Sequence, residues 1–518
     1  MVQQVTHGDA AKPDNTGRNT LDVSAYVLGM LVQQGLTFAS GVIVAHTLGP
    51  VAFGITSITR NLFALALIMA PLGLDLALLR HINERRAIDA ALVGEIALMR
   101  RYVATVSVLV LTGVALAFGP MLEHYIYHTA GFGRYLTLAF IAFPFAADTA
   151  LMAASFRGLH RPIFASIANL YVQPVARILF LIAFIIAGFG ISGVILATTC
   201  GAIASALVLS VSFARFTGRI AGGVPVAAKE RRANVNRVFS YSTWLAATLL
   251  MGGLLRSVDV LVLGYFRPSY EVGSYAAIAS IAQIIMICPQ AASQSLGARI
   301  ARHFHAGDTA RMKGDLQDYL RVAGLMTAPL FGGVAAFGPW LTLVFGARFD
   351  FSASLSLNLS VVYYISAIFA PFGYTLSMTG AHKRELGILA VGAIAAFALC
   401  CVLAPRYGGN GVAIAITVGY LGMTMARTMV VARRSNIRVG NLADAVPPLA
   451  CLGAGLLAKH LHDLIFPTLG WIDALPFVLA YGLLVVGMYL LSILTAGETQ
   501  YILRCTRKAI PLRTKEIA

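Results

Sequence analysis

Long apolar segments separated by short polar stretches recur along the whole chain. A helix needs about 20 mostly apolar residues to cross a bilayer. Fourteen segments meet that requirement, approximately 24–46, 53–79, 101–119, 135–156, 163–187, 191–213, 240–264, 273–298, 321–345, 353–379, 386–404, 410–431, 445–466 and 472–495. Because backbone polar groups in lipid must be satisfied within the segment, the pattern predicts an all-α polytopic membrane protein with fourteen transmembrane helices.

The basic residues predict how these helices are oriented. With the amino terminus in the cytoplasm, most of the 39 Lys and Arg residues fall on the cytoplasmic side. Cytoplasmic loops carry such an excess in multi-pass proteins. We therefore expect a cytoplasmic amino-terminal tail (1–23), a cytoplasmic linker (214–239) and a basic cytoplasmic tail (496–518), with the protein in the inner (plasma) membrane of a bacterium.

The chain also matches itself at an offset close to 219 residues. Gly54 pairs with Gly273, Arg80 with Arg299, and Phe189–Val194 returns as Tyr407–Val412. The match predicts an N-lobe of helices 1–6 (24–213) and a C-lobe of helices 7–12 (240–431), followed by helices 13 and 14 (445–495). Because each copy holds an even number of helices, the copies are expected to be parallel repeats around a central cavity.

Composition removes several classes of protein. The chain is 58% hydrophobic and 12% charged, with a mean hydropathy of +0.78, whereas soluble proteins are about 25% charged. The net charge of +17 lies in short clusters between apolar segments, which indicates membrane topology and not nucleic-acid binding. No CxxC pair, nucleotide-binding loop or catalytic motif is present, so we expect no metal, no cofactor and no enzyme activity.

Three arginines lie deep within predicted spans and are candidate substrate-binding residues: Arg60, Arg177 and Arg256. A charge near the bilayer centre costs at least about 2.5 kcal/mol, so these side chains should face protein or water. Arg427 lies one turn from the cytoplasmic end of its helix, and we expect its side chain to extend to the membrane surface.

Neutral amides accompany these arginines in polar stripes at helical spacing. Each amide could instead join two helices through a hydrogen bond, which is worth about 0.6 kcal/mol on average. Three such stripes together favour one aqueous cavity. The further candidate substrate-binding residues are Gln33, Gln34, Asn169, Gln173, Gln283 and Gln290.

Three acidic residues are candidates for ion coupling or charge pairing. Asp259 lies one turn after Arg256, and the two are expected to neutralise each other. Asp148 is expected to reach Arg177, which would leave Arg60 as the unpaired buried cation. Asp75, near the cytoplasmic end of helix 2, fits an interfacial structural role better than a coupling role.

Two segments carry a resemblance to a known family: VIVAHTLGPVAFGITSITRNLFALALIMAPLGLDLALLR, and RSVDVLVLGYFRPSYEVGSYAAIASI at the start of the second half. They resemble the bacterial polysaccharide-transport proteins, the Wzx-type oligosaccharide flippases of the multidrug/oligosaccharidyl-lipid/polysaccharide (MOP) exporter superfamily. The resemblance implies two six-helix lobes around a cavity, with two extra helices as in the lipid II flippases. It also implies, as substrate, an isoprenoid lipid whose pyrophosphate carries a sugar unit, with Arg60, Arg177 and Arg256 as candidates to hold the anionic head.

The resemblance implies partners as well: a lipid-linked oligosaccharide, membrane lipids, and a polysaccharide polymerase or co-polymerase. Two other functions stay open. A multidrug and toxic-compound antiporter of the same superfamily typically has twelve helices and a cavity acid for cations, whereas helix 1 here centres on Gln33 and Gln34. A membrane polysaccharide polymerase or ligase would be expected to show a large outer loop with carboxylates or histidines, and the outer loops of this chain are short.

Overall fold

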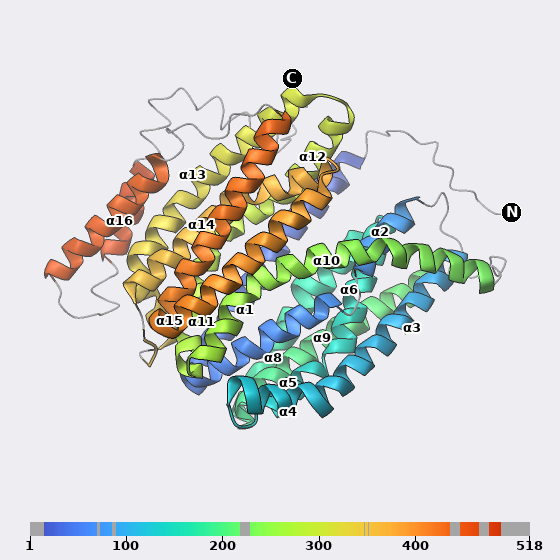
Figure 1. Ribbon diagram of the computed structural model, residues 1–518, viewed down its shortest axis with the longest axis horizontal. Helices are drawn as coiled ribbons and strands as arrows, with labels where there is room; N and C mark the ends of the chain where they lie inside the picture. Colours follow the sequence, from blue (N-terminus) through green and yellow to red (C-terminus); the bar gives the residue numbers. More distant parts are fainter. Residues whose placement is uncertain are drawn as a thin grey trace, which may run out of the picture.

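The computed structural model describes residues 15–69, 73–84, 90–217, 228–346, 348–350, 352–435, 446–465 and 476–487. This part of the chain is helical throughout (Figure 1). Its elements are α1 (Asn15–Met69), α2 (Leu74–Glu84), α3 (Ala90–Gly113), η1 (Val114–Phe118), α4 (Gly119–Met121), η2 (Leu122–Tyr127), α5 (Phe132–Phe140), α6 (Phe143–Gly158), α7 (Pro162–Ser166), η3 (Ile167–Val172), α8 (Gln173–Ile186), α9 (Gly190–Thr217), α10 (Ala228–Phe266), α11 (Ser269–Ala282), η4 (Gln283–Met286), α12 (Ile287–His305), α13 (Thr309–Leu341), η5 (Thr342–Phe345), α14 (Ala353–Met378), α15 (His382–Ser435) and α16 (Val446–Ile465).

Within the described residues, nine helices are long and apolar enough to cross a membrane. Two of them cover two predicted spans each, because a glycine in the left-handed region bends α1 at Gly49 (φ 79°) and α15 at Gly408 (φ 55°). The chain is thus an all-helical, multi-pass membrane protein, and the number fourteen stays a prediction. The predicted amino-terminal tail and basic tail lie largely or wholly outside the described residues, as do 218–227 of the linker and both ends of span 472–495.

The two halves of the chain occupy different sides of the molecule. In Figure 1, α2 to α9 gather toward the lower right and α13 to α16 toward the upper left. Helix α1 packs along α10 and α11, and α10 packs along α15, so these long helices join the two groups. Helix α16 lies against α13, and Trp340 of α13 packs on His462 of α16 with ring centroids 4.1 Å apart. From residues 476–487, the Tyr481 hydroxyl donates to the carbonyl of Pro329 in α13 at 2.8 Å.

Two backbone features support the predicted repeat. Gly190 and Gly408, which the offset pairs, both have a positive φ, 57° and 55°. Gly54 and Gly273 meet at the contact between α1 and α11. A Cβ on Gly54 would collide with the carbonyl oxygen of Ser269, and a Cβ on Gly273 would collide with that of Pro50. The repeat stays a prediction. Of the two pairs of glycines, Gly190 and Gly408 share a positive φ, and Gly54 and Gly273 share a helix contact.

Two helix contacts at positions that the predicted offset pairs use different chemistry, one ionic and one neutral. Arg100 of α3 donates from Nε and Nη2 to the two carboxylate oxygens of Asp148 in α6, each at 2.6 Å. At positions 219 residues later, the Tyr319 hydroxyl of α13 donates to the carbonyl of Ala367 in α14 at 3.1 Å. Both joints fix the third helix of a half to the fourth, and only the first uses charge.

Candidate functional site

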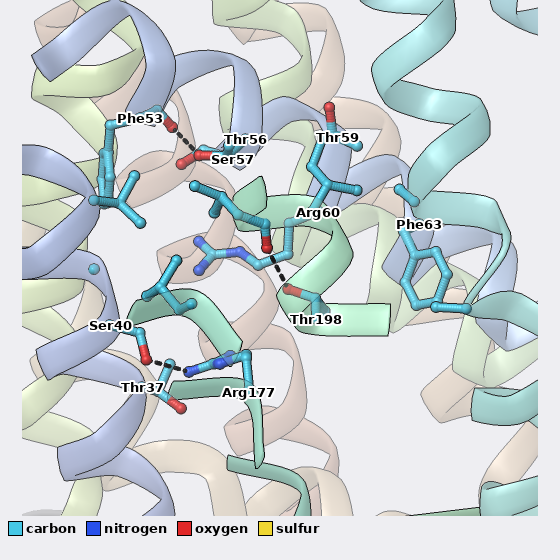
Figure 2. Close-up of a pocket in the computed structure, with 17 residues that line it drawn as sticks. Thr37, Ser40, Phe53, Thr56, Ser57, Thr59, Arg60, Phe63, Arg177 and Thr198 are labelled. Atoms are coloured by element: carbon cyan, nitrogen blue, oxygen red, sulfur yellow. Dashed lines mark hydrogen bonds between the residues drawn. The ribbon is translucent and has the colours of Figure 1, made fainter. Parts of the chain in front are cut away.

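The first part of the candidate site is a chamber of about 130 Å³ enclosed mainly by α1, α5, α8 and α9 (Figure 2). We call it the N-terminal chamber. Both Arg60 and Arg177 line it, and no carboxylate does among the described residues. Six further residues with hydroxyl groups line the same space: Thr37, Ser40, Thr56, Ser57, Thr59 and Thr198. The chamber therefore offers two cations and neutral hydrogen-bonding groups.

Arg177 is held at the wall of this chamber by α8, which begins at Gln173 directly after the π-helical turn η3. Its Nη2 donates to Ser40 Oγ at 3.3 Å, and Ser40 in turn donates to the carbonyl of Leu36 at 2.6 Å. The buried Nε has no hydrogen-bond partner within the described part of the chain. A buried donor without an acceptor costs roughly 1–3 kcal/mol. A hydrogen-bond acceptor that entered the chamber and reached this Nε would remove that cost.

Arg60 projects into the same chamber from α1 (Figure 2). Its side chain is exposed to this space although it lies within the candidate membrane-spanning segment Leu28–Met69. No hydrogen bond or ion pair joins it to another described residue. Two guanidinium groups in one small space repel each other, and an anion between them would relieve that repulsion. The geometry therefore favours a multivalent anion in the N-terminal chamber.

A second, larger chamber of about 550 Å³ lies among α10, η4, α12, α14 and α15, with Gln34 of α1 at its wall. We call it the C-terminal chamber. Gln283 and Gln290 are exposed to it, and Gln283 Nε2 donates to the Tyr363 hydroxyl at 3.2 Å. Three of the predicted amides therefore line one chamber, while Arg60 and Arg177 line the other.

Asp259 lines the C-terminal chamber but does not form the predicted pair with Arg256. Its carboxylate accepts hydrogen bonds from the Tyr275 hydroxyl at 3.0 Å and from the Val260 N–H at 2.7 Å. Arg256 Nε donates instead to the carbonyl of Gly252 at 3.3 Å. The prediction was wrong because it considered only residues on the same helix as Asp259. The carboxylate instead accepts a hydrogen bond from a tyrosine on the neighbouring helix α11.

The expectation for Arg427 was also wrong. Arg427 donates from Nε to Glu385 Oε2 at 3.2 Å and from Nη2 to Glu385 Oε1. The two side chains are only 12% and 4% exposed, so they form a buried ion pair. Both residues line the C-terminal chamber, and Arg427 does not extend to the membrane surface. A Cβ on Gly373 would lie 3.1 Å from both partners, which explains a glycine at that position of α14. The sequence analysis missed Glu385 because it follows Lys383 and Arg384 in a cytoplasmic cluster.

The remaining candidates lie apart from both chambers. Asp148 binds Arg100 and not Arg177, which corrects the second predicted pair. Asn169 accepts a hydrogen bond from Ser205 at 2.9 Å, the helix-joining alternative raised above. Gln33, Gln173 and Asp75 line neither chamber. The Asp75 Oδ1 atom is buried without a partner among the described residues.

The Arg100–Asp148 pair makes a prediction about stability. The Asp148→Asn variant is expected to lower the free energy of unfolding by about 1–3 kcal/mol, because Arg100 loses its charged acceptor. Thermal unfolding in detergent would measure the change. In a double-mutant cycle with Arg100→Gln, the two effects should fail to add. Full additivity would contradict the pairing, and Asp350→Asn, which changes an exposed aspartate, supplies the matched control.

Comparison with known proteins gives the class of the molecule. The chain has the fold of the MOP superfamily of membrane transporters. It superposes on a structure described as the lipid II flippase MurJ in an inward closed conformation with a TM-score of 0.68 at 13% identity, covering 90% of this chain and 99% of that one. It is also similar to the MATE multidrug transporter DinF-BH, with a TM-score of 0.64 at 17% identity, covering 84% and 99%. A MOP superfamily transporter from Pyrococcus furiosus superposes with a TM-score of 0.55 at 14% identity, covering 80% and 94%.

The family follows from the sequence comparison. The model of the polysaccharide biosynthesis protein family matches residues 20–294, and this chain belongs to that family. No curated protein sequence matches the chain. The family and the shared fold confirm the predicted resemblance to polysaccharide-transport proteins with the MOP fold.

Proposed function

We propose that this protein is a flippase that moves undecaprenyl-pyrophosphate-linked oligosaccharide from the cytoplasmic to the outer leaflet of a bacterial inner membrane, for the synthesis of a surface polysaccharide. The observation that carries the proposal is the pair Arg60 and Arg177 in a chamber that no described carboxylate lines. The units released at the outer face would then supply a polysaccharide polymerase or co-polymerase.

The physical need for such a chamber comes from the pyrophosphate. An ion cannot cross hydrocarbon unaided because its desolvation costs far more than binding usually returns. Guanidinium groups match phosphate oxygens with two parallel hydrogen bonds. Two of them, with hydroxyls around them, can replace the water that the pyrophosphate loses, while the isoprenoid tail stays in the bilayer.

The proposal includes the architecture that the sequence predicts. Two six-helix lobes, 24–213 and 240–431, would rock about the chambers and expose them to one side of the membrane at a time. The linker 214–239 and both termini would be cytoplasmic, and helices 13 and 14 (445–495) would stand outside the repeat. Among the three candidate acids, only Asp259 lines a chamber, so we assign ion coupling, if the cycle uses it, to Asp259.

The alternative function is a cation antiporter, because MATE transporters share the fold. A cationic substrate would need an unpaired acid in its binding site. The N-terminal chamber is lined by two cations, and both carboxylates of the C-terminal chamber, Asp259 and Glu385, already accept hydrogen bonds. The electrostatics of both chambers therefore favour the anionic lipid.

The test compares the two functions in cells that lack this protein. Lipid-linked oligosaccharide is measured in each leaflet, with surface polysaccharide and efflux of a cationic dye, before and after wild type is restored. We expect the lipid-linked unit to accumulate on the cytoplasmic face and wild type to release it. Unchanged surface polysaccharide together with a loss of dye efflux would replace the flippase by the antiporter.

A further inference from the structure

We propose that the C-terminal chamber is the glycan subsite of this transporter and that it binds a neutral, hydroxyl-rich sugar, while the pyrophosphate binds in the N-terminal chamber. The inference rests on the proposed function and adds a division of labour between the two halves of the protein. It also names the residues that would determine which glycan is carried.

Charge separates the two chambers. The N-terminal chamber has two arginines and no described carboxylate. The C-terminal chamber is lined by Arg256, Asp259, Glu385 and Arg427, whose formal charges cancel. Glu385 is paired with Arg427, and Asp259 accepts from Tyr275 and Val260. The C-terminal chamber therefore has no net formal charge, and most of its charged groups already have partners within the protein. Such a chamber attracts a pyrophosphate weakly and suits an uncharged polar group.

Hydrogen-bonding chemistry indicates what that polar group is. Gln283 and Gln290 are exposed to the C-terminal chamber. Each amide carries two donor hydrogens and an acceptor oxygen, and each phenol both donates and accepts. Tyr363 and Tyr420 line the same space and add aromatic faces. Sugar rings present hydroxyls at their edges and C–H groups on their faces, so amides beside phenols complement both.

The backbone supports these amides in an unusual way. The helix formed by α11 and α12 is interrupted by the 3₁₀ turn η4, which begins at Gln283, and Gln290 directly follows Pro289. Interrupted helices at membrane depth are tolerated where they line a cavity, and they point to binding sites in transporters. The Tyr319 hydroxyl of α13 donates to the carbonyl of Pro289 at 3.2 Å and holds the first turn of α12, directly after η4, against α13. The break therefore lies where the amides face the chamber.

Size and position allow one substrate to fill both chambers. The C-terminal chamber, at about 550 Å³, falls in the ordinary range for ligand sites, about 300–1,000 Å³, and is several times larger than the N-terminal chamber at about 130 Å³. Gln34 of α1 lines the C-terminal chamber, and Thr37, one turn further along the same helix, lines the N-terminal chamber. The smaller pyrophosphate fits beside the arginines, and the larger glycan beside the amides.

The test uses the full-length protein in proteoliposomes and three probes: undecaprenyl pyrophosphate without sugar, with a neutral oligosaccharide, and with the same oligosaccharide containing one uronic acid. The readout is the ratio of flipping rates for the neutral-glycan and sugar-free lipids. In Gln283→Leu and in Tyr363→Phe we expect this ratio to fall about fivefold, the effect of one lost neutral hydrogen bond. Arg60→Gln should slow both probes together and leave the ratio near the wild-type value.

Each outcome separates the glycan subsite from the proposed function. Tyr265→Phe changes an exposed tyrosine outside both chambers and should keep the wild-type ratio. If wild type flips the lipids but Gln283→Leu and Tyr363→Phe keep its ratio, the glycan subsite is excluded and the flippase stands. Faster flipping of the uronic-acid probe than of the neutral one would overturn the assignment of a neutral glycan. If wild type moves none of the probes, the proposed function itself fails.

Discussion

Replacing Arg60 by Gln in the full-length protein is expected to slow flipping of the lipid-linked glycan by about 100-fold. Removing one partner of a desolvated charge pair costs about 2–5 kcal/mol, and about 2.7 kcal/mol corresponds to 100-fold. The Arg177→Gln variant should lose a similar factor, because the Arg177 Nε has no acceptor of its own within the described residues. Flipping into the outer leaflet of proteoliposomes, with a fluorescent lipid-linked glycan, measures both.

Charge and geometry can be separated at the same position. Arg60→Lys should recover part of the rate, because lysine keeps the charge but loses the planar, two-pronged match to phosphate oxygens. The matched control is Arg311→Gln, which removes an arginine whose side chain is 77% exposed and lies outside both chambers. If Arg60→Gln and Arg311→Gln flip the substrate at the same rate, the N-terminal chamber does not bind the anionic head.

The sequence was sufficient for the fold and for the two arginines. Apolar runs predict membrane helices because lipid leaves few alternatives for the backbone, and family and fold confirm that class. The cost of a charge in the membrane singled out Arg60, Arg177 and Arg256. The structure brings the first two into one chamber and places Arg256 in the other. Both inferences depend on the lipid that surrounds the protein and not on how the helices pack against one another.

Partners of the charged groups could not be predicted in this way. Arg100 and Asp148 are 48 residues apart, and Arg427 and Glu385 are 42 apart. Spacing along one straight helix gives no information about a partner on another helix, or on the other side of a bend such as that of α15 at Gly408. The two pairs proposed from sequence were wrong for that reason. The sequence also could not show that Gln34, Gln283 and Gln290 line a different chamber from Arg60 and Arg177, since that depends on the direction in which each helix face points.

A second large effect is expected from Gly54, where α1 and α11 touch. In Gly54→Leu, the new side chain would collide with the carbonyl oxygen of Ser269. A backbone atom cannot move aside like a flexible side chain, so the cost should reach the upper end of the 1–3 kcal/mol typical of overpacking. This penalty applies only to the conformation in which the two helices are in contact, and it should reduce the population of that conformation by about 100-fold.

Other contacts join the same two halves near Gly54 and would be lost with it. The His46 Nε2 lies 2.7 Å from the carbonyl oxygen of Val344, and the rings of Phe53 and Phe345 pack edge to face with centroids 5.7 Å apart. In the proposed topology this contact lies at the outer ends of the helices. Opening it while the inner side is also open would abolish alternating access, so flipping should fall at least about tenfold in Gly54→Leu.

Labelling of a cysteine placed at Thr37, in the N-terminal chamber, by a reagent added outside measures this opening directly. We expect labelling to increase in Gly54→Leu and not in Gly113→Leu, because no atom lies within 4 Å of a Cβ on Gly113. The same contact can be tested from α11: Gly273→Leu would collide with the carbonyl oxygen of Pro50 and should give the same labelling. If Gly54→Leu flips substrate and labels as wild type does, α1 and α11 do not need this close approach for transport.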